Sequence, residues 1–181
     1  MHRILLVDDE PGILSALRRV FATARAEDVG GEPISVEAFD DPEAALVRAA
    51  EQPFDLVISD YRMPKLSGVE FLERLIEIQP GCARLILSAY TDLDGLVGAI
   101  NRARISRFLS KPWHDVELKL AVRQALEGRA LQRENARLAD LVRVQRGELT
   151  RAQMELKRLE EQFPGLRAQE DAARSNRTKQ G

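Results

Sequence analysis

The sequence contains one cysteine among its 181 residues, Cys82, so no disulfide can form within the chain. We expect this thiol to be buried, because cysteine is among the residue types most often found inside proteins. No apolar run approaches the roughly 20 residues that a membrane span requires, and the N-terminus, Met1–Arg3, lacks the pattern of a secretory signal. These absences predict a soluble cytoplasmic protein with no membrane segment.

Histidine and dense basic blocks are also scarce. His2 and His114 are too isolated to suggest a metal or phosphorelay site. Residues 1–128 hold 15 basic and 21 acidic residues, a balance of −6, whereas residues 129–181 hold 12 basic and 8 acidic residues, a balance of +4. Because the basic residues of the second part are scattered, a solvated helix surface is favoured over a nucleic-acid footprint, and we predict no direct nucleic-acid binding.

The first part, residues 1–128, alternates short apolar runs with amphipathic segments. Continuous apolar runs are typical of strands that are buried on both faces. The alternation predicts an α/β fold with helices on both faces of a parallel sheet. The expected topology is a flavodoxin-like (βα)5 doubly wound sheet with strand order 2-1-3-4-5. The predicted strands are 3–7, 34–38, 55–59, 83–87 and 106–110, and the predicted helices are 11–26, 41–51, 67–78, 92–102 and 114–128.

Four of the predicted strands end in residues that carry chemistry. Asp8 and Asp9 follow the first strand, Asp60 the third, Ser88 the fourth and Lys111 the fifth. Because ligands bind beyond the carboxyl ends of parallel strands, we expect these side chains to meet at one edge. Three carboxylates repel one another unless a cation neutralises them, and oxygen-only ligands favour Mg²⁺. Four matched positions on four strands argue against the alternative, that these are loop residues with no joint role.

The same residues suit phosphoryl transfer. Asp60 is the best nucleophile candidate, because a carboxylate that attacks phosphorus forms an acyl phosphate. Mg²⁺ would bridge that carboxylate and the phosphoryl oxygens, bound directly by Asp9 and mostly through water by Asp8. Lys111 would pair with Asp60 at rest and with a phosphoryl oxygen afterwards. The hydroxyl of Ser88 would donate to another phosphoryl oxygen.

From about residue 129 the strand signals end and a heptad pattern begins. Val142 is β-branched at an a position, leucines occupy d positions, and Asn135 is a lone polar a residue; these features favour a two-stranded parallel coil. We predict a coiled-coil helix over 129–163 that pairs two copies of the chain. The expected d series is Leu131, Leu138, Gln145, Ala152 and Leu159, and the a series is Asn135, Val142, Leu149, Leu156 and Phe163.

Other arrangements of this second part remain open. A single amphipathic helix folded back on the first domain is the alternative to the coil. Gly128 would be a flexible point between the two parts, since glycine weakens a helix interior. Pro164–Gly165 terminates the pattern, and the polar residues 164–181 are predicted to be a disordered tail.

Residues 1–128 resemble the receiver domain of two-component response regulators. The matching segments are ILLVDDEPGIL (4–14), DLVISDYRMPKLSGVEFL (55–72), LILSAY (85–90) and RFLSKPW (107–113), which together are highly specific. The resemblance implies that Asp60 is phosphorylated by a sensor histidine kinase or a phosphotransfer protein. It implies that Asp9, Asp60 and the backbone carbonyl of Arg62 hold Mg²⁺, and that the Lys111–Pro112 peptide is cis.

The resemblance also implies a conformational switch. Ser88 would move toward the phosphoryl group, and Phe108 would then rotate inward against the fourth helix, so that the fourth helix, fifth strand and fifth helix carry the signal. Arg62 and Tyr90, two residues after Asp60 and Ser88, would tune the lifetime of the phosphate. The alternatives are that Ser88 is a simple strand-end hydroxyl and that Phe108 is ordinary core.

The output is less well defined by sequence. No helix-turn-helix, ATPase P-loop or nucleotide cyclase signature follows residue 128. The RMP, GVEFL and KPW segments are similar to receivers fused to HD-GYP phosphodiesterases or AAA+ activators, so we expect either an excised N-terminal part of such a regulator or a complete regulator acting through its helix. A phosphorylation-independent adaptor is the alternative from another class. A phosphatase acting on external substrates lacks a substrate-pocket signal, and we expect no enzyme.

Overall fold

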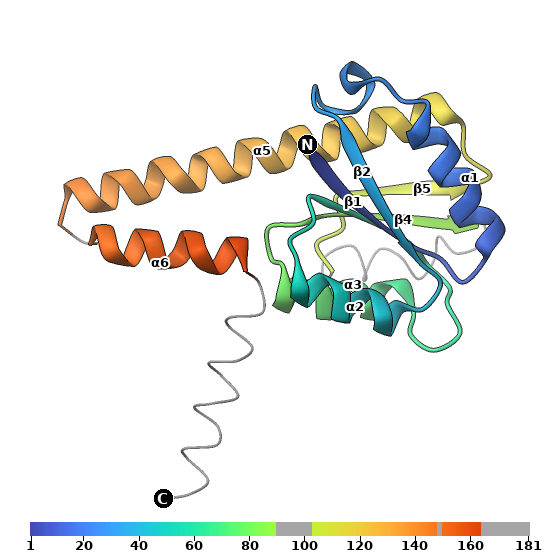
Figure 1. Cartoon of the computed structure of the whole chain (residues 1–181), viewed down its shortest axis with the longest axis horizontal. Helices are drawn as coiled ribbons and strands as arrows, with labels where there is room; N and C mark the ends of the chain where they lie inside the picture. The colour runs from blue at the N-terminus through green and yellow to red at the C-terminus, as the bar shows by residue number, and fades with distance from the viewer. Residues whose placement is uncertain (90–102, 148–149, 164–181) are drawn as a thin grey trace, which may run out of the picture.

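The protein is described here from a computed structural model that covers residues 1–89, 103–147 and 150–163. Its centre is a five-stranded parallel sheet in the order β2-β1-β3-β4-β5 (Figure 1). This confirms the predicted flavodoxin-like topology. The predicted fourth helix with Tyr90, the seam residue Leu149 and the tail 164–181 lie outside the described residues. The strands are β1 (His2–Val7), β2 (Ile34–Phe39), β3 (Leu56–Asp60), β4 (Ala83–Ala89) and β5 (Arg107–Lys111).

Helices cover both faces of the sheet (Figure 1). On one face α1 and the first half of α5 pack over the sheet, and on the other face α2 and α3 do so. None of the described helices is both long and apolar enough to cross a membrane. The helices are α1 (Pro11–Ala22), the 3₁₀ helix η1 (Ala26–Val29), α2 (Pro42–Glu51), α3 (Gly68–Ile78), α5 (Asp115–Gln145) and α6 (Arg151–Gln162).

The continuous apolar runs are explained by burial on two sides. Side chains alternate across a strand, so that Ile4 and Leu6 of β1 pack in the core under α1 and α5, whereas Leu5 and Val7 pack in the core under α2 and α3. Cys82 lies in the second core, as predicted, and burial raises the pKa of its thiol to about 12. The thiol is therefore a protonated packing residue at neutral pH.

Two helix ends show which local signals operate. Ser67 caps α3: its hydroxyl accepts the Glu70 N–H at 3.3 Å, and the Glu70 carboxylate accepts the Ser67 N–H at 3.0 Å. The first helix ends at Ala22, four residues before the predicted end. There the Thr23 hydroxyl bonds back to the carbonyls of Arg19 and Val20, and this local hydrogen bonding competes with helix continuation.

The predicted single helix over 129–163 is wrong. The fifth helix passes through Gly128 without interruption and ends at Gln145, and Gly147 then adopts a left-handed φ of 73°. A second helix, α6, starts after Thr150, whose hydroxyl accepts the Gln153 N–H. This Thr-x-x-Gln capping box is a helix-start signal, which stops one helix from continuing along the heptads.

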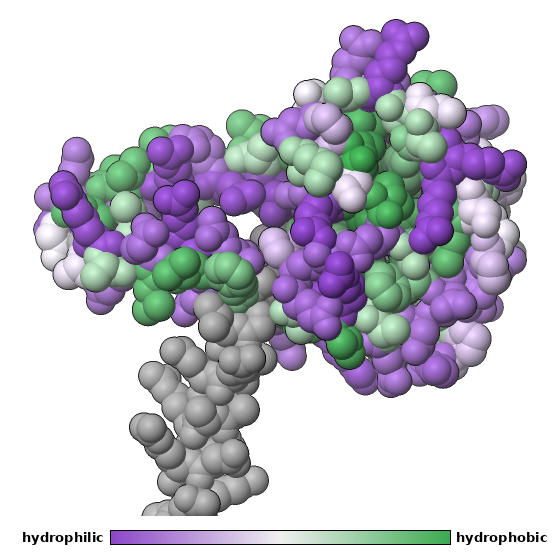
Figure 2. Space-filling view, in the orientation of Figure 1, coloured by the Kyte–Doolittle hydropathy of each residue, from purple (hydrophilic) through white to green (hydrophobic). Residues whose placement is uncertain are grey.

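The two C-terminal helices form a hairpin, in which α6 runs back beside α5 in the opposite direction (Figure 1). Lys157 of α6 holds the buried carboxylate of Asp140 on α5 at 2.6 Å. The C-terminal part therefore folds back on itself, which is neither of the two arrangements predicted from the sequence. The hairpin leaves apolar side chains at its surface (Figure 2), including the predicted seam residues Leu131, Leu138, Val142, Leu156 and Leu159; Asn135 is exposed too.

Candidate functional site

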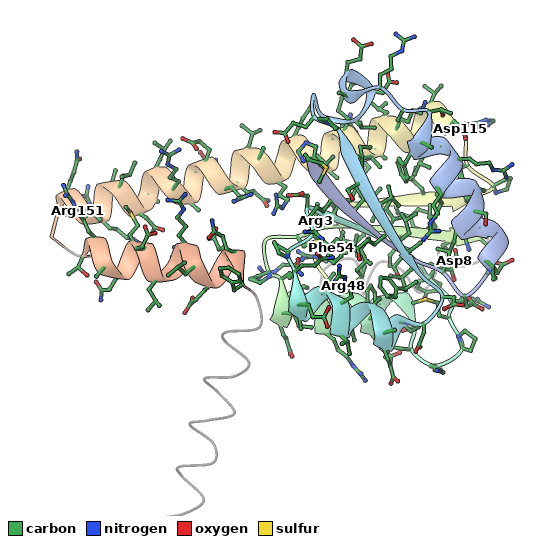
Figure 3. The ribbon with its side chains drawn as sticks, viewed as in Figure 1. Arg3, Asp8, Arg48, Phe54, Asp115 and Arg151 are labelled. Atoms are coloured by element: carbon green, nitrogen blue, oxygen red, sulfur yellow. The ribbon has the colours of Figure 1, made fainter. Side chains whose placement is uncertain are left out.

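The predicted site residues lie at the carboxyl edge of the sheet. Asp8 directly follows β1 (Figure 3), and Asp60 is the last residue of β3. The register of the strands brings the neighbouring ends level: Asp60 pairs with Leu87, and Ser88 pairs with Ser110, just before Lys111. Parallel pairing of buried strands thus assembles groups that are far apart in the sequence.

Lys111 connects the acidic residues at the carboxyl edge of the sheet. Its ammonium contacts Oδ1 of Asp60 at 2.5 Å and Oδ2 of Asp8 at 2.8 Å, with Oε1 of Glu10 farther away at 3.8 Å. The two aspartates are almost completely buried, so the ion pairs are largely shielded from water. The Lys111–Pro112 peptide is cis, as predicted. The predicted pairing of Lys111 with Asp60 in the resting protein is therefore present.

The charges at this edge influence one another. Burial raises the pKa of Asp8, and the nearby charge of Asp60 adds to that shift, while hydrogen bonds from Lys111 and from the Glu10 N–H oppose it. Burial also disfavours the charged form of Lys111, but the two carboxylates outweigh it, so the pKa of the lysine is raised. The ammonium is therefore firmly protonated and neutralises two carboxylates that would otherwise repel each other.

The backbone around Asp60 fixes where its carboxylate points. The Arg62 N–H donates to Oδ2 of Asp60 at 2.7 Å, and the Tyr61 N–H continues the sheet by donating to the Leu87 carbonyl at 2.8 Å. Oδ1 is left for Lys111. The carboxylate therefore has one oxygen held by the main chain and the other by an ammonium, a preorganised arrangement.

Gly68 was not among the site residues predicted from sequence. It opens α3, and its N–H donates to the Tyr61 carbonyl at 3.0 Å. An added Cβ there would lie 1.9 Å from the carbonyl oxygen of Asp60. The residue is required by close approach of two backbones, and the only sequence signal for it is its place directly after the helix cap Ser67.

The remaining predicted residues are placed less centrally. Ser88 is buried at the end of β4, where its hydroxyl donates to the Ala89 carbonyl at 3.1 Å. Phe108, on β5, is half-buried and packs against the core under α2 and α3. The side chain of Arg62 is exposed, and Asp9 is half-buried in the loop after β1. The roles predicted for these residues stay predictions.

The carboxylates at this edge are chemically suited to a hard divalent cation. Carboxylate oxygens at one edge, contributed by Asp8, Asp9 and Asp60, are the ligands that Mg²⁺ prefers. Within residues 1–89, 103–147 and 150–163, however, no three His, Cys, Asp or Glu side chains already converge as a metal-binding group. Lys111 neutralises two of these three carboxylates, those of Asp60 and Asp8. The carboxylates can therefore bind a cation once the Lys111 ammonium gives up part of its contact with them.

Comparison with known proteins places these features in a family. The family model for the response regulator receiver domain matches residues 4–123. The chain is 37% identical over 135 residues to the hydrogenase transcriptional regulatory protein HoxA of Cupriavidus necator, covering 75% of this chain and 26% of that protein. It is 33% identical over 124 residues to the transcriptional regulatory protein GlrR of Escherichia coli, covering 68% and 26%. The chain thus spans about a quarter of these relatives' length.

Solved structures show the same fold. The signal receiver domain of an HD domain-containing protein from Pseudomonas fluorescens is 36% identical, with a TM-score of 0.64, and the match covers 71% of this chain and 97% of that one. A response regulator receiver domain protein from Clostridium thermocellum is 28% identical, with a TM-score of 0.63, and the match covers 73% and 99%.

Proposed function

Because the chain belongs to the response regulator receiver family, we propose that Asp60 accepts a phosphoryl group from a sensor histidine kinase or a phosphotransfer protein. The observation that carries this proposal is the position of Lys111, whose ammonium joins the buried carboxylates of Asp60 and Asp8. An oxygen of Asp60 attacks the phosphorus of a phosphohistidine. The P–N bond breaks, and the bond's electron pair leaves with the imidazole.

Each residue at the edge has a task in this step. Lys111 stays protonated and transfers its contact from Oδ1 of Asp60 to a phosphoryl oxygen, offsetting the added negative charge. The Arg62 N–H keeps Oδ2 in place while Oδ1 reacts. Mg²⁺, held by Asp9, Asp60 and the Arg62 carbonyl and through water by Asp8, would supply further charge neutralisation for the transfer.

We extend the proposal to signalling. A phosphoryl group adds charge and three acceptor oxygens at one point, which biases a pre-existing two-state element. The buried hydroxyl of Ser88 would leave the Ala89 carbonyl for a phosphoryl oxygen, and half-buried Phe108 would rotate inward. Arg62 would shield the phosphate from water, a role that we also propose for Tyr90.

Phosphorylation can be tested on the intact chain. Incubation with acetyl phosphate and Mg²⁺ should add the mass of one phosphoryl group, with acetate as the leaving group, and Asp60→Asn should abolish the gain. The matched control is Asp40→Asn, which changes an exposed carboxylate directly after β2. A mass gain in Asp60→Asn equal to the parent's would refute Asp60 as the acceptor.

The C-terminal hairpin is our candidate for the output. We propose that Leu131, Leu138 and Val142 of α5 pack, together with Leu156 and Leu159 of α6, against the hairpin of a second copy, because these side chains are largely exposed in one chain. This homodimer would join two hairpins instead of two uninterrupted helices. The alternative is that the chain is the N-terminal part of a longer regulator with an AAA+ or HD-GYP output, as the relatives' greater lengths allow.

Light scattering on the full chain, with and without acetyl phosphate, measures the dimer directly. Leu138→Glu should give monomers, whereas Val47→Glu, at an exposed apolar position on α2, should not. Equal dimerisation of the two variants would refute the hairpin contact. A dimer that ignores phosphorylation would favour the adaptor function.

We also propose that the chain is a phosphoryl acceptor in the cytoplasm and does not turn over external substrates. Asp8 and Asp60 are buried and both contact Lys111. A small phosphoryl group can reach such a carboxylate more easily than a bulky substrate can. Release of phosphate from a simple ester, in amounts exceeding the protein, would contradict this.

A further inference from the structure

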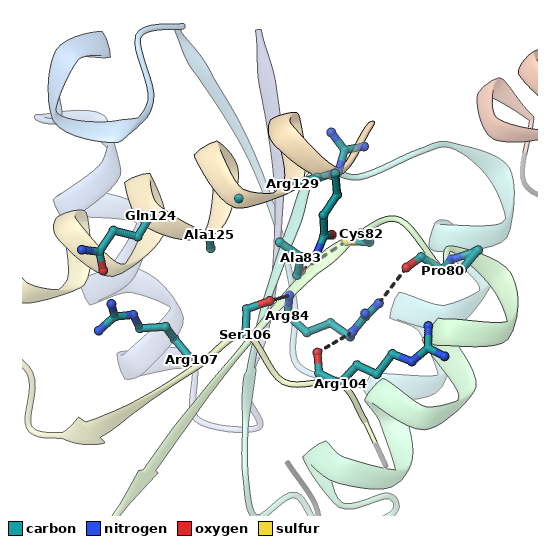
Figure 4. A pocket seen from close by; sticks show the side chains of 12 residues that line it. Pro80, Cys82, Ala83, Arg84, Arg104, Ser106, Arg107, Gln124, Ala125 and Arg129 are labelled. Atoms are coloured by element: carbon teal, nitrogen blue, oxygen red, sulfur yellow. Dashed lines mark hydrogen bonds between the residues drawn. The ribbon is translucent and has the colours of Figure 1, made fainter. Parts of the chain in front are cut away.

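A polar pocket lies at the opposite edge of the sheet from Asp60, where β4 and β5 begin under the middle of α5 (Figure 4). Its volume is about 430 Å³, within the range of small-molecule sites. Among the described residues, four arginines line it and no carboxylate does. The polar lining residues are Arg84, Arg104, Arg107, Arg129, Ser106, Gln124 and Gln132.

Arg84 is the unusual member of this lining. Its side chain is buried, and its guanidinium donates two long hydrogen bonds to main-chain oxygens of the described residues, at 3.4 Å to Arg104 and at 3.5 Å to Pro80. Neither of these two partners, within residues 1–89, 103–147 and 150–163, is a carboxylate. The carboxylate of Asp55 pairs with Arg129 instead. Burial lowers the pKa of Arg84, and the charge of Arg104 adds to this shift. A buried cation without a counter-charge is costly.

Arg104, beside Arg84 in the pocket, has an unusual backbone conformation. Its φ of 45° is left-handed, a conformation that is strained for a residue with a Cβ and that concentrates at functional sites. This conformation presents its carbonyl to Arg84, and the two side chains extend in the same direction, toward Pro80 (Figure 4). On the other side of the pocket, Arg107 lies near Gln124 (Figure 4).

Arg129 lines the pocket, and its charge is already neutralised by a carboxylate of the protein. Its guanidinium contacts Oδ1 of Asp55 at 2.5 Å and the Gly81 carbonyl at 2.8 Å. Asp55 in turn accepts the Arg3 N–H at 2.7 Å, so α5 is anchored to the sheet beside the pocket. The pocket therefore has one neutralised arginine in its wall and three without a carboxylate partner in the described part of the chain.

We propose that this pocket binds a small phosphorylated molecule, with Arg84 and Arg104 donating to its phosphate oxygens. The planar guanidinium fork matches phosphate geometry, and a doubly charged group suits several adjacent cations better than a single carboxylate does. The site is separate from the phosphorylation edge: Arg84 and Ser88 are four residues apart along β4, about 13 Å. The proposal does not depend on phosphorylation of Asp60.

The test uses the full chain and inorganic phosphate as the probe, at ionic strength matched with chloride. Side-chain NMR of the arginines should show saturable shifts at Arg84 and Arg104, and calorimetry should show that Arg104→Gln weakens binding about tenfold. Arg104 is exposed, so this variant keeps the buried Arg84 intact. The matched control, Arg18→Gln on the exposed face of α1, should bind phosphate like the parent.

Four outcomes would overturn the proposal. Absence of saturable binding would remove the site, and unchanged affinity in Arg104→Gln would detach it from these residues. Shifts confined to Lys111 would place the phosphate at the other edge. The dicarboxylate succinate should bind more weakly than phosphate, and equal affinity would refute the preference for a phosphorylated ligand.

Discussion

Gly68 lies against the main chain of Asp60, so closely that a Cβ on residue 68 would be 1.9 Å from the Asp60 carbonyl oxygen. The same atom would lie 3.0 Å from Oγ of Ser59, whose hydroxyl donates to that carbonyl. The start of α3 therefore supports the end of β3 from behind. A side chain at this position must move either the helix or the residue that carries the reactive carboxylate.

Gly68→Ala should lower the free energy of unfolding by about 2 kcal/mol, the usual cost of overpacking a close contact. It should also slow phosphorylation of Asp60 by acetyl phosphate, because the carboxylate moves relative to Lys111. Chemical denaturation and timed intact mass measure the two effects. Gly12→Ala is the control, since a Cβ there meets nothing within 4 Å. Parent-like phosphorylation by Gly68→Ala would show that the contact does not position Asp60.

Lys111→Met should destabilise the metal-free protein, because it leaves two buried carboxylates facing each other without a cation. We expect a loss of about 3 kcal/mol, typical of a broken buried ion pair. Mg²⁺ should restore part of this loss and should stabilise the variant more than it stabilises the parent. Lys65→Met removes only an exposed contact with Asp41 and should change stability by less than about 1 kcal/mol. Absence of any Mg²⁺ rescue would argue against a cation at this edge.

Glu37, on the edge strand β2, makes the stability of the protein depend on pH. Its carboxylate accepts from Arg48 at 2.8 Å and from Arg3 at 3.1 Å, and Figure 3 labels both arginines. The Arg48 hydrogen bond lowers the pKa of Glu37 below its usual 4.5, with help from Gln52 and Arg3 and against the effect of burial. The stabilisation is therefore present above the unfolded-state pKa and is lost as the pH falls through the lower folded-state pKa.

Glu37→Gln should thus lower the free energy of unfolding at neutral pH by about 1 kcal/mol. The difference from the parent should shrink as the pH falls below 4.5 and through the folded-state pKa of Glu37. Urea denaturation over a pH series measures this dependence. Glu43→Gln, an exposed carboxylate on α2, should show little pH-dependent difference. If the free energy of unfolding of Glu37→Gln stayed below that of the parent at low pH, the loss of stability would come from the shape of the side chain and not from its charge.

The sequence predicts the receiver fold and its polar edge well because both depend on short-range patterns. Two-sided burial makes β1 and β3 continuously apolar, and a parallel sheet then places Asp8 and Asp60 together. The contact of Lys111 with Asp60 is predicted on the same basis, whereas its second contact, with Asp8, is found only in the structure. Gly68 is not predicted as a site residue. Its importance comes from the short distance between its backbone and that of Asp60, and the order of residue types along the chain does not reveal such a distance.

The C-terminal part shows where a periodic pattern misleads. The heptads continue in phase from Leu131 to Leu159, and that regularity predicts one helix. The structure instead has two helices, because α5 ends at Gln145, Gly147 adopts a left-handed φ, and Thr150 starts a new helix with Gln153. Local capping signals therefore outweigh a periodicity that is equally satisfied by two shorter helices.

Gly147→Ala tests that explanation. The φ of 73° at Gly147 is unfavourable for any residue with a Cβ, and a Cβ there meets no neighbour within 4 Å, so the cost is conformational and about 1 kcal/mol. The variant should open the hairpin, and amide hydrogen exchange in α6 should become faster. Gly128→Ala places a better helix former inside α5 with open space around it, and should leave exchange in α6 unchanged.

The same pair of variants separates the two models of dimerisation. If Gly147→Ala allows α5 to continue into α6, the heptads from Leu131 to Leu159 become one seam, and light scattering should show a tighter dimer with a longer shape. If the substitution only loosens α6, the exposed hairpin surface is lost and dimerisation should weaken. Faster exchange caused by Gly128→Ala instead would place the flexible point at residue 128, within α5, and would contradict the turn at Gly147 as the controlling element.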